Sequence, residues 1–385
     1  MSTKDSRIII DKIKTYAIGG FTADLVNDYY SDQQFLNRLN LDAFDTSPYY
    51  TKDDADAAYL ASGRSKDISN HYTKDYIDSY VYNTLKSYVS GEIDGHGNAV
   101  SKIMVAGGLG TPPKSTVEQK LLSDNSNFLL FGSLQTATHS SSSASDGVNQ
   151  AVIGGMDSSA PTDVVQAKSF SYSASYLSYA TITVPSIGTS STSDKTSFYW
   201  SGGYESSARV DRIARRPFED ITASVESYGS LSSARSETCQ SSNGIVSLIF
   251  GGSSNTAITT SIIEKIQFMS ASSASDFGAI PMSTSRSVAG SNGSEVIIAG
   301  EGIHTYKKSF SSAANAFAWG NLDAALSDSA AGSDGTSLWI AGGSNSSVTA
   351  SSSLQAKSFS SNAIATTTHG SMTEVKTSLT GCTGG

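Results

Sequence analysis

One sequence pattern constrains this chain more than any other. A short apolar run that ends in a glycine pair, or in a single glycine, recurs six times in 385 residues. The first glycines follow one another at steps of 47, 48, 49, 49 and 42 residues, at Gly107, Gly154, Gly202, Gly251, Gly300 and Gly342. A period of this length built from short strands is typical of a β-propeller. We therefore expect an all-β fold in which these glycines serve as scaffold.

Hairpin turns are predicted just before four of the six runs. Seven residues ahead of the run's first glycine stands the glycine of a turn dipeptide: Asp146-Gly147, Asn243-Gly244, Asn292-Gly293 and Asp334-Gly335. Such dipeptides favour two-residue hairpin turns, because both central residues need positive φ. The strand that ends at the glycine pair is therefore expected to be antiparallel to the strand before it.

An aromatic-Gly-x-aliphatic element marks the next part of the repeat. Its glycine lies 22 residues before the first glycine of the run, as at Phe131-Gly132, Tyr228-Gly229, Phe277-Gly278 and Trp319-Gly320. A weaker copy is His369-Gly370, and in the repeat ending at Gly202 the segment 184–187 stands in its place. We expect the aromatic ring to pack between neighbouring sheets and the glycine to permit close approach of the chain.

A Lys-Ser-Phe-Ser segment completes the repeat. It begins at Lys168, Lys308 and Lys357, and in the first and last of these it follows the first glycine of the pair by about 15 residues. Its alternation predicts a half-exposed strand with phenylalanine inward and lysine outward. Each repeat then holds about four short strands, which is one propeller blade.

The last repeat stops at its hairpin turn, so another segment must complete the ring. Residues 8–19 lead into the pair Gly19-Gly20 and fit the glycine-pair rule, which favours seven blades. Residues 20–97 would then hold first-blade strands and an insert, and residues 98–385 the remaining blades. In the alternative, residues 100–106 close a six-bladed ring and residues 1–96 form a separate N-terminal domain.

The segment 31–97 breaks the period and is predicted to be a partly helical insert. Residues 1–96 contain 11 of the 18 tyrosines of the chain. Tyrosine suits protein or glycan contact, because it offers a large area and one hydrogen-bonding group. Insertions in repeat proteins often lie on the binding face. The candidate partner-binding residues are Tyr49, Tyr50, Tyr59, Tyr72 and Tyr76, although an insert without a binding role is the alternative.

Charge and composition exclude several classes of partner. The net charge is −9 and no basic stripe is present, which argues against a nucleic-acid surface. No apolar run approaches the ~20 residues that cross a membrane, and no signal peptide is recognisable at the N-terminus. We expect synthesis in a cytoplasm. The two cysteines, Cys239 and Cys382, lie in different repeats and are expected to be free.

The repeat resembles the kelch-like repeats of virion proteins of tailed bacteriophages. The segment Ser275–Ile280, continuing to Ala299-Gly300, carries the resemblance best, and the likeness covers about residues 98–385. The Tyr and Trp that accompany the glycines in cellular kelch proteins are absent. The resemblance implies a structural virion component of tail-fibre, neck or capsid-appendage type, present in many copies, that binds neighbouring virion proteins. A host-receptor or glycan-binding adhesin is the alternative.

Catalytic interpretations find little support in the sequence. Five scattered histidines do not suggest a copper oxidase, and a single Asp334-Gly335 does not make a sialidase. A glycan depolymerase would need two acids across a pocket. The acidic cluster Asp53, Asp54 and Asp56 lacks the pattern of an EF-hand loop. We expect no enzyme activity, no cofactor and no metal site. The four clustered arginines Arg209, Arg212, Arg215 and Arg216 are either solvated or contact a neighbouring subunit.

Overall fold

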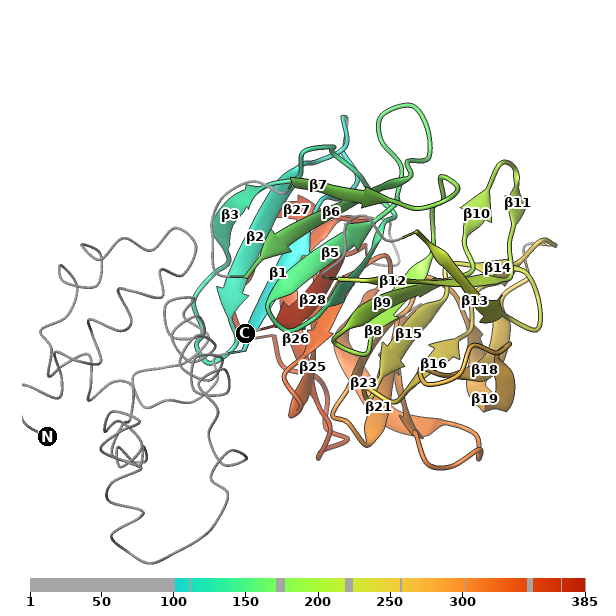
Figure 1. The fold of residues 1–385 in the computed structure, drawn as a ribbon. Helices are drawn as coiled ribbons and strands as arrows, with labels where there is room; N and C mark the ends of the chain where they lie inside the picture. The colour runs from blue at the N-terminus through green and yellow to red at the C-terminus, as the bar shows by residue number, and fades with distance from the viewer. Residues whose placement is uncertain are drawn as a thin grey trace, which may run out of the picture. The chain divides into compact units, whose positions relative to one another are not determined.

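Six antiparallel four-stranded sheets follow one another along the chain (Figure 1). They are seen in a computed structural model that describes residues 101–384, apart from 111, 171–176, 219–223, 257, 301, 345–348 and 368. The innermost strand of each sheet contacts the innermost strands of the two neighbouring sheets, and these contacts form a closed cycle. This part of the chain is a six-bladed β-propeller, which confirms the expected all-β propeller of four-stranded blades.

The blades are numbered along the chain, and each is given from its innermost to its outermost strand. Blade 1 is β28 (Thr380–Gly384), β1 (Lys102–Ala106), β2 (Thr116–Leu121) and β3 (Leu129–Ser133). Blade 2 is β4 (Ser142–Ser145), β5 (Asn149–Ile153), β6 (Val164–Ser169) and β7 (Leu177–Thr181). Blade 3 is β8 (Ser190–Ser193), β9 (Ser197–Ser201), β12 (Arg212–Pro217) and β13 (Glu226–Ser230).

The second half of the ring repeats this order. Blade 4 is β15 (Cys239–Ser242), β16 (Val246–Phe250), β18 (Thr260–Gln267) and β19 (Ser275–Thr284). Blade 5 is β20 (Val288–Ser291), β21 (Glu295–Ala299), β22 (Gly302–Ser309) and β23 (Phe317–Leu326). Blade 6 is β24 (Ala330–Ser333), β25 (Ser337–Ala341), β26 (Ser351–Ser358) and β27 (Ser371–Lys376). Two short pairs join β10 (Tyr204–Glu205) to β11 (Ala208–Arg209), and β14 (Arg235–Ser236) to β17 (Ser253–Ser254).

The six apolar runs form the second strand of each blade. In β1, Ile103 and Val105 pack against blade 6, whereas Met104 and Ala106 pack against blade 2. Because side chains alternate between the two faces of a sheet, and a neighbouring blade covers each face, all four residues from Ile103 to Ala106 are apolar. The core is accordingly divided into six clusters, one between each pair of neighbouring blades.

The C-terminal strand closes the ring. β28 pairs antiparallel with β1, from Ala106 opposite Thr380 to Lys102 opposite Gly384, and β2 occupies the other edge of β1 (Figure 1). The six-blade count of the alternative is therefore confirmed, whereas its separate N-terminal domain 1–96 lies outside the described residues. The preference for seven blades is wrong, because β1 supplies the pairing that the truncated last repeat needs. Residues 8–19 and 20–97 lie outside the described residues.

The glycine pair recurs because one blade touches the next at this point. The first glycine has positive φ, as at Gly202 (φ 61°), where a Cβ atom would lie 2.3 Å from the carbonyl oxygen of Arg235 in the chain entering blade 4. The N–H of the second glycine, Gly203, donates to the same carbonyl at 2.8 Å. Gly107 and Gly108 make the same contacts with Thr138. A side chain would push the blades apart.

The hairpin turns form at the predicted dipeptides, with one difference in detail. The N–H of Asp146 donates to the carbonyl of Asn149, so the central residues are Gly147 and Val148, and only Gly147 has positive φ. The Asp146 carboxylate accepts the N–H groups of Val148 and Asn149 at 2.7 and 2.6 Å. Aspartate therefore occupies the position before the two central residues of the turn, where its carboxylate accepts backbone N–H groups. Residues with the same role are Asp194, Asn243, Asn292 and Asp334.

The aromatic element of blade 2 lies earlier than the sequence interpretation placed it. The segment 184–187 is not part of the outer strand, which ends at Thr181. Ala180 pairs with Val165 in the way that Gly132 pairs with Val117, and Ile182 is buried like Leu134. The element is Tyr179-Ala180-Thr181-Ile182, and the search for a glycine missed it because alanine stands in the glycine position.

The turn of blade 3 offers a test of these roles. Lys195 has φ 74° and stands where the other turns have a glycine. We expect Lys195→Gly to raise the free energy of unfolding by about 1 kcal/mol, because it removes backbone strain. Gly244→Ala should lower it by a similar amount, although no atom lies within 4 Å of the added Cβ. Urea unfolding measures both changes. Equal midpoints for the two variants and the parent protein would contradict the assignment.

Candidate functional site

The tyrosines predicted to bind a partner do not fall in the described part of the chain. Tyr49, Tyr50, Tyr59, Tyr72 and Tyr76 all precede residue 101. The candidate site is therefore sought at the two ends of the propeller. We name the end that carries the glycine pairs the glycine-pair face. The opposite end, which carries the hairpin turns and the loops between third and fourth strands, is named the turn face.

Buried lysines fix the loops of the turn face. Lys120 donates to the carbonyl oxygens of Asp124 and Ser126 at 2.9 and 2.6 Å. These two residues follow the lysine by four and six positions in the sequence. Lys308 and Lys357 bind the carbonyls at the same two offsets in their own blades, at Ser312 and Ala314 and at Ser361 and Ala363. The prediction of outward lysines is wrong: Lys308 is 1% and Lys357 0% exposed. The loop carbonyls replace water as acceptors, which permits burial of the ammonium group.

The same lysines also reach the preceding blade. The Nζ atom of Lys308 lies 4.3 Å from the ring centroid of Phe277 in blade 4, and that of Lys168 lies 4.3 Å from Phe131 in blade 1. Burial lowers the pKa of both lysines to about 8. Each amine still carries its proton at neutral pH, as attraction to the ring face requires. The expected packing of the aromatic element between blades is confirmed.

The glycine of the aromatic element lies against the lysine-held loop of the next blade. A Cβ atom on Gly320 would lie 2.1 Å from the carbonyl oxygen of Asn362 in the loop that Lys357 holds. On Gly370 it would lie 2.1 Å from that of Ser126 in the loop held by Lys120. One loop is thus fixed from its own blade and from the preceding blade.

A buried acid or amide lies two residues before three of the lysines and binds the preceding blade. Oε1 of Gln166 accepts the N–H of Thr136 at 2.9 Å, and Nε2 donates to the carbonyl of the same residue at 3.0 Å. Glu118 and Gln355 bind backbone N–H groups in the same way. The sequence interpretation missed these residues, although a Glu/Gln-x-Lys pattern at the blade period would have revealed them.

Two of the seams between blades bury an ion pair. Lys376 lies 2.9 Å from Glu118 across the seam that β28 closes, and neither side chain is exposed. Glu264, the blade-4 counterpart of Glu118, pairs with the buried Arg235. Removing one member of such a pair leaves an uncompensated charge in the interior, so each pair ties two blades together.

Six residues form a hydrogen-bonded ring around the axis on the glycine-pair face. Each N–H donates to the carbonyl of the ring residue one blade earlier, at 2.7 to 3.3 Å. All six have φ between 51° and 62°. The ring consists of Ser140, Gly188, Glu237, Arg286, Asp328 and Ser378. It links each blade to both neighbours just before the innermost strand begins.

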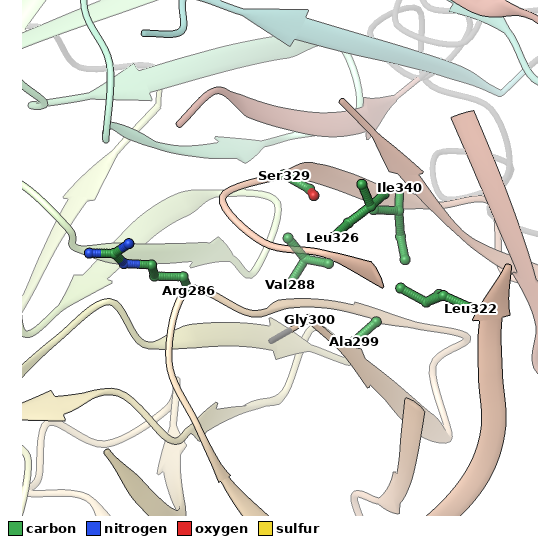
Figure 2. Close-up of a pocket in the computed structure, with 8 residues that line it drawn as sticks. All are labelled: Arg286, Val288, Ala299, Gly300, Leu322, Leu326, Ser329 and Ile340. Atoms are coloured by element: carbon green, nitrogen blue, oxygen red, sulfur yellow. The ribbon is translucent and has the colours of Figure 1, made fainter. Parts of the chain in front are cut away.

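The charged members of this ring lie beside a shallow crevice between blades 5 and 6. Nε of Arg286 lies 3.1 Å from Glu237, and Nη1 lies 3.7 Å from Asp328. The pKa of Asp328 is raised, mainly by burial, while Arg286 opposes the shift. Figure 2 shows Arg286 to one side of apolar side chains that include Leu322 and Ile340.

The crevice is a packed notch rather than a ligand pocket. Its empty space is about 160 Å³ including the part open to solvent, and none of it admits the centre of a water-sized sphere. The crevice lies beside Ala299 and Gly300. At this point the link between the second and third strands is the shortest of the six blades, because β21 ends at Ala299 and β22 begins at Gly302. The short link accounts for the single irregular step in the glycine period.

The arginine cluster of blade 3 has partners within the chain. Arg212 lies 2.5 Å from Glu205, and Arg215 lies 3.9 Å from Glu226. Arg209 donates to the hydroxyl of Ser236 at 2.9 Å. Each of these three arginines therefore has an acidic or hydroxyl partner within the chain.

Reactive groups are dispersed in the described residues. This part of the chain contains no group of three or more His, Cys, Asp or Glu side chains placed to hold a metal ion, and no helix long and apolar enough to span a membrane. Cys239 and Cys382 are free, as expected, and burial raises the pKa of the Cys239 thiol to about 12. Comparison with known proteins yields no matching family model and no matching curated protein.

The turn face presents exposed apolar side chains on its fixed framework. In blade 4, Ile245 is 65% and Met269 89% exposed, and the N–H of Phe268 donates to the carbonyl of Ile245, so the two lie together. Ile364, in the loop held by Lys357, is 61% exposed. Contiguous exposed apolar groups are typical of protein contact surfaces, whereas single ones are ordinary.

The lysine contacts predict a large effect of an almost isosteric change. We expect Lys357→Met to lower the free energy of unfolding by about 3 kcal/mol, because the carbonyls of Ser361 and Ala363 lose their buried donor. The matched control is Lys114→Met, since the Lys114 side chain is 43% exposed and should change stability by less than about 0.5 kcal/mol. Urea unfolding measures both, and similar values for the two variants would refute the role of Lys357.

Proposed function

We propose that this chain is a non-enzymatic structural protein of a bacteriophage virion, and that it binds neighbouring virion proteins through the turn face. The observation that carries the proposal is the combination of fixed loops and exposed apolar side chains on that face. Lys357 holds the loop that presents Ile364, and backbone pairing holds Ile245 beside Met269. A surface that is ordered before binding loses little conformational entropy when a partner docks.

The choice of partner rests on the repeat. The aromatic-glycine element and the glycine pair, on which the resemblance to kelch-like phage virion proteins depends, coincide with the contacts between blades at Gly202, Gly320 and Phe277. A repeat whose defining residues serve the ring leaves the loops free to vary with the partner. The proposed location is the virion, in many copies, at the tail, neck or capsid.

Exposed apolar side chains also favour a broad protein contact over a small ligand. Met269 and Ile245 protrude from the turn face, and protruding apolar side chains can enter pockets of a partner as anchors. The crevice near Arg286, by contrast, has no space for a bound molecule. A partner with a complementary apolar surface is therefore the ligand that suits this end of the propeller.

Assembly of particles with variant chains tests the proposal. In phage that carry Ile245→Asp together with Met269→Asp, we expect the copies per purified particle to fall at least tenfold, because two carboxylates would be buried in the contact. The control is Ile258→Asp, which changes an equally exposed side chain (64%) of the same blade on the glycine-pair face. Quantitative mass spectrometry gives the copy number, and thermal unfolding confirms that both variants fold.

The parent chain should occur in a fixed multiple that matches the symmetry of a virion part. Absence of the chain from purified particles would overturn the proposal. Equal loss in the control variant would overturn the assignment to the turn face. Competition of the soluble protein with phage adsorption would instead favour a host-receptor role.

A further inference from the structure

Two hairpin turns of the propeller carry the same tripeptide, Ser-Asn-Gly. One lies at 242–244 in blade 4 and the other at 291–293 in blade 5. An asparagine that precedes a glycine can lose its side-chain amide spontaneously, because no glycine side chain shields the backbone nitrogen that attacks it. Both glycines are exposed, so water and hydroxide reach both turns. The chain thus holds one reactive tripeptide in two folded environments.

The turn of blade 4 polarises the side-chain carbonyl of its asparagine. Oδ1 of Asn243 accepts the N–H groups of Ile245 and Val246 at 3.0 and 2.9 Å. Attack on this carbonyl turns its oxygen into an oxyanion, and two backbone donors that are already in place stabilise such a charge. The blade-5 turn supplies two donors in the same way, at 3.0 and 2.8 Å. This feature therefore favours the reaction equally in both turns.

The attacking nitrogen distinguishes the two turns. In blade 5 the N–H of Gly293 donates to Oγ of Ser291 at 2.8 Å. In blade 4, Oγ of Ser242 donates instead to the carbonyl of Ser193 in blade 3 at 2.7 Å. Among the residues that the structure describes, no acceptor takes the N–H of Gly244. Because the nitrogen must give up its proton before it attacks, a hydrogen bond from this N–H slows the reaction.

We propose that Asn243 is a site of spontaneous deamidation in the folded protein, and that Ser291 protects the equivalent Asn292. The nitrogen of Gly244 loses its proton to hydroxide and attacks Cγ of Asn243, and Nδ2 leaves as ammonia. Water then opens the cyclic imide at one of its two carbonyls, which yields aspartate or isoaspartate. The net change exchanges an amide for a carboxylate and consumes water, so it needs no oxidant and no cofactor.

The two products affect the turn differently. Asp146, Asp194 and Asp334 accept backbone N–H groups at the same position of their own turns, so the aspartate product keeps the turn intact. An isoaspartate adds a methylene group to the backbone, which changes the turn that sets the register of β15 and β16. Both products place a new charge beside Ile245 on the turn face, but the modification does not depend on the proposed function.

Peptide mapping by mass spectrometry, after incubation of the purified full chain at mildly alkaline pH, tests the proposal. In the folded protein we expect Asn243 to deamidate about tenfold faster than Asn292, the factor that one hydrogen bond to the attacking nitrogen represents. The same chain unfolded in concentrated urea is the internal control. The two tripeptides are identical there and should react at similar rates.

A substitution in blade 5 tests the protecting bond. Ser291→Ala removes the acceptor of the Gly293 N–H, and we expect it to raise the rate at Asn292 about tenfold and to leave that at Asn243 unchanged. Ser294→Ala, in the same turn, is the matched control and should change neither rate. Equal thermal midpoints would show that both variants fold.

Equal rates at the two asparagines of the folded parent protein would overturn the proposal. So would a Ser291→Ala chain in which Asn292 reacts no faster, or a difference between the two sites that persists in urea. Loss of virion incorporation does not enter these rates, so failure of the proposed function would leave this result unaffected.

Discussion

Close contact between backbones of neighbouring blades is the constraint on which the rest of this structure depends. At Gly202 there is room for a hydrogen atom but not for a methyl group beside the carbonyl of Arg235. The N–H of Gly203 takes that carbonyl as its acceptor, and the axial ring then links Glu237 to Gly188 and Arg286. Five blades make this contact in the described part of the chain, at the pairs that begin with Gly107, Gly154, Gly202, Gly251 and Gly342.

Charge buried at the seams complements these backbone contacts. An interior lysine is tolerated where loop carbonyls and an aromatic face receive it, as Lys308 shows with Ser312 and Phe277. The same ammonium group orders the loop that the turn face presents. Stability of the ring and rigidity of the candidate binding face therefore have one physical origin, and a partner would meet a surface that is already in place.

The sequence predicted the blade period, the strand order within a blade and the role of the aromatic element, because each depends on local spacing. It failed where the answer depends on a neighbour. The alternating pattern predicts that Lys357 points outward, and only the adjacent loop explains why it is buried. The choice between six and seven blades needed the pairing of β28 with β1. The axial ring has no common residue type, since Gly188 and Arg286 adopt the same backbone conformation.

Hydrogen exchange of the C-terminal strand tests the closed ring most directly. In the ring described here, the amides of β28 are paired with β1, and the N–H of Ser378 is bonded to Asp328. Peptides covering 378–384 should therefore exchange as slowly as those covering β4, which is the innermost strand of blade 2 and has no role in closure. Exchange of 378–384 within seconds, while β4 stays protected, would show that the ring is open and would contradict the account.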